Sequence, residues 1–105
     1  MIRIVISKTD NLISSITFFG HAMFAPHGKD IVCAGVSSIL TTTVNGILRF
    51  NDDAISHEQN SDEFKLFIHC YDDVTNKLIE NMIDLLKSLE INYPKNIKLE
   101  EEKTK

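Results

Sequence analysis

The chain has 105 residues and a net charge of −4, with 43% hydrophobic and 25% charged residues. This length suits one domain with a modest core, and the composition is typical of a globular protein, so we expect a single domain over residues 1–105. The first fifty residues carry four basic and two acidic side chains, which leaves a net charge of −6 on the remainder. This acidic balance argues against nucleic acid as a partner.

The two cysteines, Cys33 and Cys70, indicate the compartment. The first residues favour a strand rather than a signal peptide, and thiols without an export signal are typical of a reducing environment. We therefore expect a cytoplasmic protein without a disulfide. Residues 31–48 carry no charge, but their six Ser, Thr and Asn side chains argue against a membrane span. No membrane partner is expected.

The first half predicts two strands, a loop and a helix. Alternating apolar residues favour strands over 2–7 and 12–19, with a turn between them at residues 8–11. Residues 20–30 contain proline and glycine and should form a loop. Asp30 can cap a helix over 31–50, although threonine and glycine in it are poor helix formers. Apolar spacing predicts its buried face as Val32, Val36, Ile39, Leu40, Thr43, Ile47 and Phe50.

The second half predicts a hairpin with strands over 53–58 and 63–70, followed by a helix over 73–90 that Asp72 can cap. The buried stripe of this helix should be Val74, Leu78, Met82, Leu85, Leu86 and Leu89. Residues 96–100 suit a short edge strand, and the tail after it should be solvated and frayed. The order ββαββα plus this optional strand predicts an α+β fold, with both helices packed on a mainly antiparallel sheet.

Cys33 is placed for nucleophilic chemistry. With Asp30 as the cap, Cys33 lies in the first helical turn, where backbone N–H groups and the helix dipole favour a thiolate. An imidazolium from His21 or His27 would lower the pKa of the thiol further. The same N–H groups could hold an oxyanion, and Ser37, one turn further along the same face, could bind a substrate carbonyl, a water or the thiolate.

Simpler interpretations apply to the same residues. Cys33 could be a buried small hydrophobe, which is the usual role of a cysteine in an uncharged helix. Ser37 could bond back to the preceding turn, and Asp30 could act only as a cap. These readings leave a non-enzymatic binding module as the alternative to an enzyme.

Metal and anion sites are weaker interpretations. His21, His27 and Cys33 have five residues between neighbours, which matches no compact zinc pattern, so we expect no metal and no cofactor. Gly28 and Lys29 before a helix would suit an anion, but the full phosphate-loop pattern is missing.

A two-part motif identifies a family resemblance. Gly20-His21-Ala22, a loop with Gly28, and Asp30-Ile31-Val32-Cys33-Ala34-Gly35-Val36-Ser37 resemble the bacterial ribosomal-processing cysteine protease Prp family. The similarity extends over essentially the whole chain. It implies a cysteine endopeptidase that removes the N-terminal extension of a large-subunit ribosomal protein and cuts after an aromatic pair. The alternative function is a non-enzymatic ribosome-associated or peptide-binding module.

The resemblance also implies roles for individual residues. His21 would be the general base and Cys33 the nucleophile of a Cys-His dyad, with His27 as a second candidate base. Asp30 and Ser37 would support the site. The substrate-binding loop that covers the peptide would include Gly20, Ala22, His27, Gly28 and Lys29.

The resemblance further implies a homodimer, and the predicted first helix gives an independent reason to expect one. The side of this helix opposite its apolar face would consist of small neutral residues, Ala34, Ser38, Thr42 and Asn45. A helix side exposed to solvent normally carries charge. These residues should therefore contact either a second subunit or the hairpin of the same chain.

Overall fold

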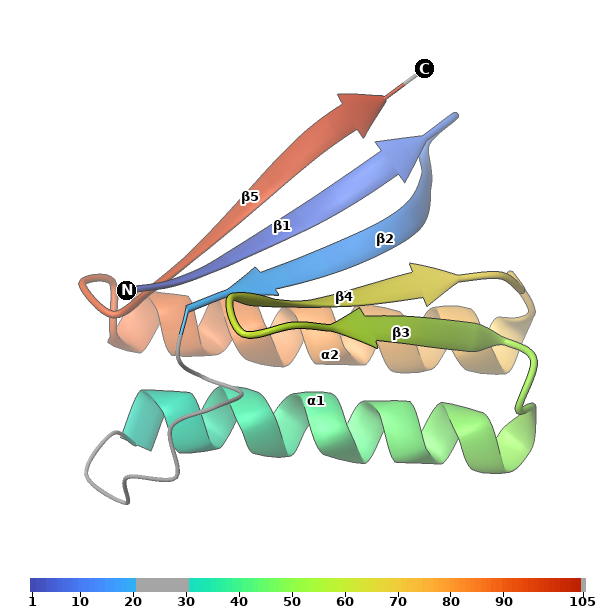
Figure 1. The fold of residues 1–105 in the computed structure, drawn as a ribbon, viewed down its shortest axis with the longest axis horizontal. Coiled ribbons are helices and arrows are strands. Elements are labelled where there is room, and N and C mark those ends of the chain that lie inside the picture. The colour runs from blue at the N-terminus through green and yellow to red at the C-terminus, as the bar shows by residue number, and fades with distance from the viewer. Residues whose placement is uncertain (21–30, 105) are drawn as a thin grey trace.

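The computed structural model describes residues 1–20 and 31–104, which form a five-stranded sheet with two helices on one face (Figure 1). The predicted α+β class is confirmed. The elements in chain order are β1 (Ile2–Thr9), β2 (Leu12–Phe19), α1 (Ile31–Phe50), β3 (Ile55–Gln59), β4 (Glu63–Ile68), α2 (Asp73–Asn92) and β5 (Ile97–Thr104).

The strands lie in the order β3-β4-β2-β1-β5. Three neighbouring pairs are antiparallel, and β5 runs parallel to β1, so the sheet is mixed. The expectation that the chain frays after residue 100 is wrong, because β5 pairs with β1 as far as Thr104. Arg3 and Lys8 each form a 2.7 Å ion pair across this pairing, with Glu100 and Glu101 respectively. A segment with the composition of a solvated tail is thus ordered by its neighbour.

The β1–β2 hairpin turns at Asp10 and Asn11, whose φ angles are 54° and 66°. Two successive residues with positive φ are typical of the tight turns that match the twist of antiparallel strands, and aspartate and asparagine tolerate this conformation. The predicted turn at residues 8–11 is therefore shorter than expected, and β1 continues to Thr9.

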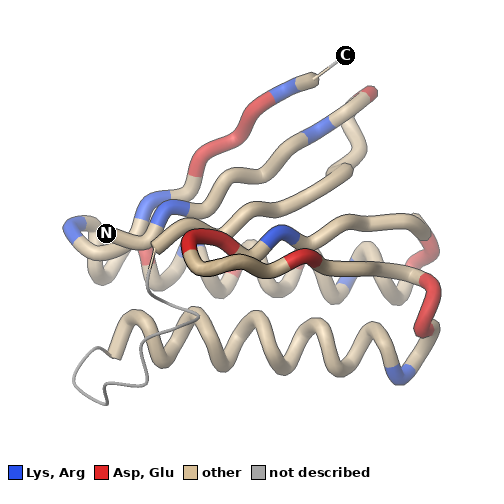
Figure 2. The backbone as a smooth tube through the Cα atoms, in the orientation of Figure 1, with Lys and Arg blue, Asp and Glu red and all other residues tan. Residues whose placement is uncertain are grey.

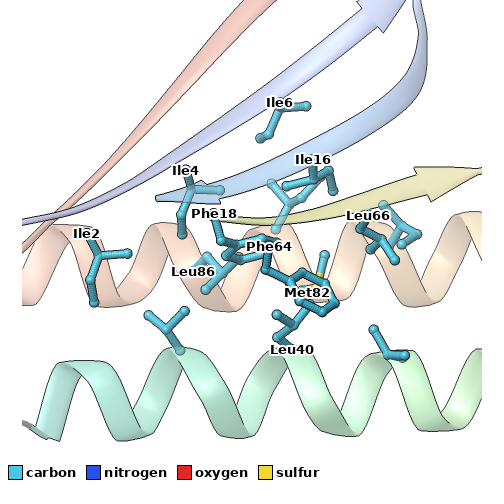
Figure 3. Packing of buried hydrophobic residues seen from close by; sticks show 14 of the residues in the cluster. Ile2, Ile4, Ile6, Ile16, Phe18, Leu40, Phe64, Leu66, Met82 and Leu86 are labelled. Atoms are coloured by element: carbon cyan, nitrogen blue, oxygen red, sulfur yellow. The ribbon is translucent and has the colours of Figure 1, made fainter. Parts of the chain in front are cut away.

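The core lies between the sheet and the helices (Figure 3). On α1, most of the predicted face is buried, but Phe50 is 54% exposed because the helix ends there. On α2, Met82 and Leu86 are buried as predicted, whereas Val74 and Leu85 are exposed. The buried sector of α2 is displaced around the helix from the predicted stripe, because the packing against the sheet and α1, rather than the leucine spacing, sets which side is covered. Its buried residues are Thr75, Ile79, Met82, Ile83 and Leu86.

The outer side of α1 is uncharged and exposed to solvent. Ala34, Ser38, Thr42 and Asn45 are all exposed, so the hairpin of the same chain does not cover them. Figure 2 shows that the first charged residue along α1 is at its end, where Arg49 lies. The hairpin of the same chain, which was one of the two expected partners of this surface, is therefore excluded.

The length and mean hydropathy of α1, 1.7, meet the usual criterion for a membrane-spanning helix. The argument from its six polar residues was therefore too strong. A core helix of a globular protein passes the same test, and α1 contributes Val36, Leu40 and Ile47 to the buried cluster beneath the sheet. The absence of a membrane partner stays a prediction.

Asp72 caps α2 as predicted. Its carboxylate accepts hydrogen bonds from the Thr75 backbone N–H and hydroxyl, both at 2.9 Å, and the backbone bond is the main reason that the pKa of Asp72 lies below its ordinary value of 3.8. The stabilisation that the ionised Asp72 carboxylate provides is fully present above pH 3.8 and is lost as the pH falls through the lower, folded-state pKa.

We expect Asp72→Ala to lower the melting temperature at pH 7. Asp72→Asn, which keeps a cap without a titrating group, should lose less stability below pH 4 than the parent, and thermal melts from pH 7 to 2 measure this. An equal fall in melting temperature below pH 4 for the parent and for Asp72→Asn would contradict the assignment of Asp72 as an ionised cap.

Candidate active site

Cys33 is the third residue of α1, so its predicted place in the first helical turn is confirmed. The first turn of α1 contains no acidic side chain. The positive end of the helix dipole is therefore not offset from within α1. This feature favours a thiolate at Cys33 and negative charge on a substrate oxygen beside it.

Cys33 is also part of the hydrophobic core. Its exposed fraction is 4%, and it belongs to the same buried cluster as Val32 and Val36. The packing role considered as an alternative is thus real, and it coexists with the position at the start of the helix.

Ser37 is half-buried and lies one turn beyond Cys33 on the same helix. Residues four apart in a helix lie one above the other on the same side, so the two side chains face a common region as predicted. The other predicted site residues, His21, Ala22, His27, Gly28, Lys29 and Asp30, lie outside the described residues. Their roles as base, support and substrate-binding loop stay predictions.

Gly20 is the last described residue before the predicted loop. Its part in binding substrate stays a prediction, and what the structure shows is its backbone geometry. Its φ is +108°, a conformation that side chains rarely adopt. A Cβ built at this position would lie 3.0 Å from the Met1 carbonyl oxygen and 3.4 Å from the Ile2 Cα. Both contacts are with backbone atoms, so they cannot be relieved by a side-chain rotation.

We expect Gly20→Ala to destabilise the protein by about 1–3 kcal/mol, because it combines a strained φ with a backbone clash. Urea denaturation at pH 7 measures this. A matched control is Gly46→Ala in α1, where an added Cβ meets nothing within 4 Å, and which should be neutral or stabilising because alanine favours a helix. Equal effects of the two substitutions would contradict the assignment.

Cys70 and Cys33 are not joined by a disulfide. The Cys70 sulfur lies 3.8 Å from Asn51 Nδ2 and 3.9 Å from the Asp53 carbonyl oxygen. It is half-buried and packs against the core, just beyond the end of β4 rather than within the strand as predicted. Its surroundings are those of a packing residue.

Metal ligands do not gather in the described part of the chain. Within residues 1–20 and 31–104, no group of three His, Cys, Asp or Glu side chains could hold a metal ion. Of the three residues considered for zinc, His21, His27 and Cys33, only Cys33 is among these residues.

Comparison with known proteins decides the class of enzyme. The family model described as cysteine protease Prp matches residues 1–98. The chain belongs to the Prp family of cysteine proteases. It is an enzyme, and the non-enzymatic binding module considered above is not its function.

Relatives in other bacteria agree with this assignment. The ribosomal processing cysteine protease Prp of Mycoplasma genitalium is 34% identical over 85 residues, which cover 79% of this chain and 83% of the relative. Prp of Staphylococcus aureus is 29% identical over 103 residues, or 94% of this chain and 97% of the relative. The crystal structure of S. aureus Prp with a covalently linked product peptide matches with a TM-score of 0.85 at 26% identity, covering 97% of this chain and 100% of that one.

Proposed function

We propose that this protease removes the N-terminal extension of a large-subunit ribosomal protein in the cytoplasm, cutting after an aromatic pair. The observation that carries the proposal is the position of Cys33 in the first turn of α1, within a chain of the Prp family. Relatives with the same fold are ribosomal processing proteases, and one of them holds a covalently linked product peptide. A covalent link is what a cysteine nucleophile would produce.

The proposed mechanism uses a Cys-His dyad. His21 takes the proton from the Cys33 thiol, and the thiolate attacks the scissile carbonyl carbon to form a C–S bond. The N–H groups at the start of α1 stabilise the oxyanion of the tetrahedral intermediate. The intermediate expels the amine, which takes the proton back from His21. Water, deprotonated by His21, then hydrolyses the thioester and restores the thiol. Asp30 and Ser37 support the dyad.

The first experiment is cleavage of a peptide that spans the N-terminal extension and the first residues of the mature ribosomal protein. Mass spectrometry of the products identifies the bond that is cut. The proposal predicts one cut, after the aromatic pair, and its loss when that pair is replaced by alanine. Cleavage at unrelated positions, or no cleavage by folded and reduced protein, would contradict the proposed substrate.

We also propose that the enzyme is a homodimer joined through the outer side of α1. The exposed side chains of Ala34, Ser38, Thr42 and Asn45 are small and uncharged, so two copies of this surface can approach closely without repulsion between like charges. Sedimentation of the parent and of an Ala34→Glu, Ser38→Glu double variant tests this. The parent should sediment as a dimer and the variant as a monomer. A monomeric parent, or a variant that still sediments as a dimer, would contradict the proposed interface.

A further inference from the structure

β3 forms one of the two edges of the sheet. It pairs with β4 on one side, and in the part of the chain that the structure describes no strand lies on its other side. Four of its five residues are exposed. Figure 1 shows β3 starting near the C-terminal end of α1 and running back towards the end that carries Cys33. This edge therefore leads towards the active site.

The hydrogen bonds of the β3–β4 hairpin fix which backbone groups face outwards. The Asn60 N–H donates to the Glu63 carbonyl at 3.0 Å, and the His69 N–H donates to the Ala54 carbonyl at 2.8 Å. In an antiparallel ladder such bonded pairs alternate with non-bonded ones. Counting residues inwards from the Asn60–Glu63 pair and from the Ala54–His69 pair gives the same alternation of bonded and non-bonded pairs. The residues of β3 that direct N–H and C=O to the open side are Ile55, His57 and Gln59.

The side chains of the same residues lie on the helix side of the sheet, because their partners on β4 point into the core. His57 and Gln59 are nevertheless exposed, so neither helix covers this strip. The His57 ring stacks on Phe64, with the ring centroids 5.2 Å apart and the planes 14° from parallel. A strand added beside β3 would place alternate side chains next to this aromatic pair.

The opposite edge of the sheet is protected against such pairing. β5 carries five charged residues among its eight, whereas β3 carries one, Glu58. Charged side chains along an edge strand discourage another chain from pairing with it, and a weakly charged edge permits it. Charge therefore distinguishes β3 from β5.

The lengths of β3 and α1 show how far a peptide paired with β3 would have to extend to reach Cys33. β3 is about 17 Å long, and Cys33 lies about 26 Å along α1 from Phe50, near which β3 begins. Along the helix axis this leaves about 9 Å, and the separation between the sheet and the helix layer adds to it, so at least about three extended residues are needed. A peptide paired with β3 would therefore have to continue beyond the strand by at least that length to reach Cys33.

We infer that the open edge of β3 binds the substrate polypeptide as an added antiparallel or parallel strand, held by the main-chain N–H and C=O of His57. In this mode main-chain bonds supply affinity, and alternate side chains contacting His57 and Phe64 supply specificity. The inference rests on the proposed function, since the occupant is the peptide that the protease cuts.

Two substitutions at one position separate backbone from side-chain recognition. His57→Ala keeps the N–H, whereas His57→Pro removes it, and because this N–H faces outwards the β3–β4 ladder remains intact. With the extension peptide as the probe, we expect His57→Pro to raise KM about tenfold or more, and His57→Ala to raise it less than about threefold. Thermal melts establish that both variants fold.

A second measurement needs no protein variant. Peptides N-methylated at one residue at a time should show weaker binding at alternate positions, about three residues or more from the scissile bond, because only every second N–H of a paired strand faces β3. A uniform response, or parent-like KM for folded His57→Pro, would overturn the inference while leaving the proposed function intact. If the parent does not cut the unmodified peptide, both fail.

Discussion

Replacing Cys33 with alanine is expected to reduce cleavage of the extension peptide by at least about 10³-fold, because it removes the nucleophile and with it the covalent intermediate. The fold should persist. The substitution deletes one buried sulfur atom in the core cluster, at a cost of about 1 kcal/mol in the free energy of unfolding. Mass spectrometry of timed digests, with urea denaturation of both proteins, measures the two effects separately.

Cys70→Ala is the matched control, because Cys70 is the other thiol and packs beyond the end of β4. It should retain cleavage. Alkylation by iodoacetamide adds a sharper test, since exposure alone would make half-buried Cys70 react before Cys33, which is 4% exposed. Faster alkylation of Cys33 at pH 6 would show thiolate character at the start of α1. Undiminished cleavage by Cys33→Ala would refute its role as the nucleophile.

Leu86→Ala should destabilise the protein by about 2–5 kcal/mol, the range found when a fully buried leucine is truncated and its neighbours relax only partly. Leu86 is 0% exposed and lies beneath the sheet with Met82 (Figure 3). Marginal stability makes such a loss large for a domain of this size. Urea denaturation followed by circular dichroism measures it.

Leu85→Ala, at the adjacent position, removes the same atoms from a side chain that is 45% exposed. Its cost should be less than about 1 kcal/mol, because less apolar surface is lost from the interior. Similar losses for the two substitutions would mean that the orientation of α2 differs from the one described, or that a second subunit covers Leu85.

Local patterns predicted much of this molecule. Alternating apolar residues located β2 and most of β1, and apolar spacing located α1 with both of its bounds. Asp72 located the start of α2 because a cap acts on the turn directly after it. The position of Cys33 in the first turn of α1 followed from the same local signals.

The family motif contributed what periodicity cannot, namely the prediction that Cys33 is the nucleophile and that His21 is its general base. It says nothing about the β3 edge, because a strand becomes an edge only through the order of all strands in the sheet. No signal in the sequence marks the backbone of His57 as open.

Long-range contacts settled the remaining features. The charged segment from Glu100 to Thr104 became a strand because β1 offered it backbone partners, and nothing within the segment favours that outcome. Leu85 and Leu86 are identical in type and adjacent, and only the packing of α2 against the sheet buried one and exposed the other. Periods and caps act over a few residues and can be deduced from the chain alone, whereas strand order, edges and the exact buried sector depend on partners distant in sequence.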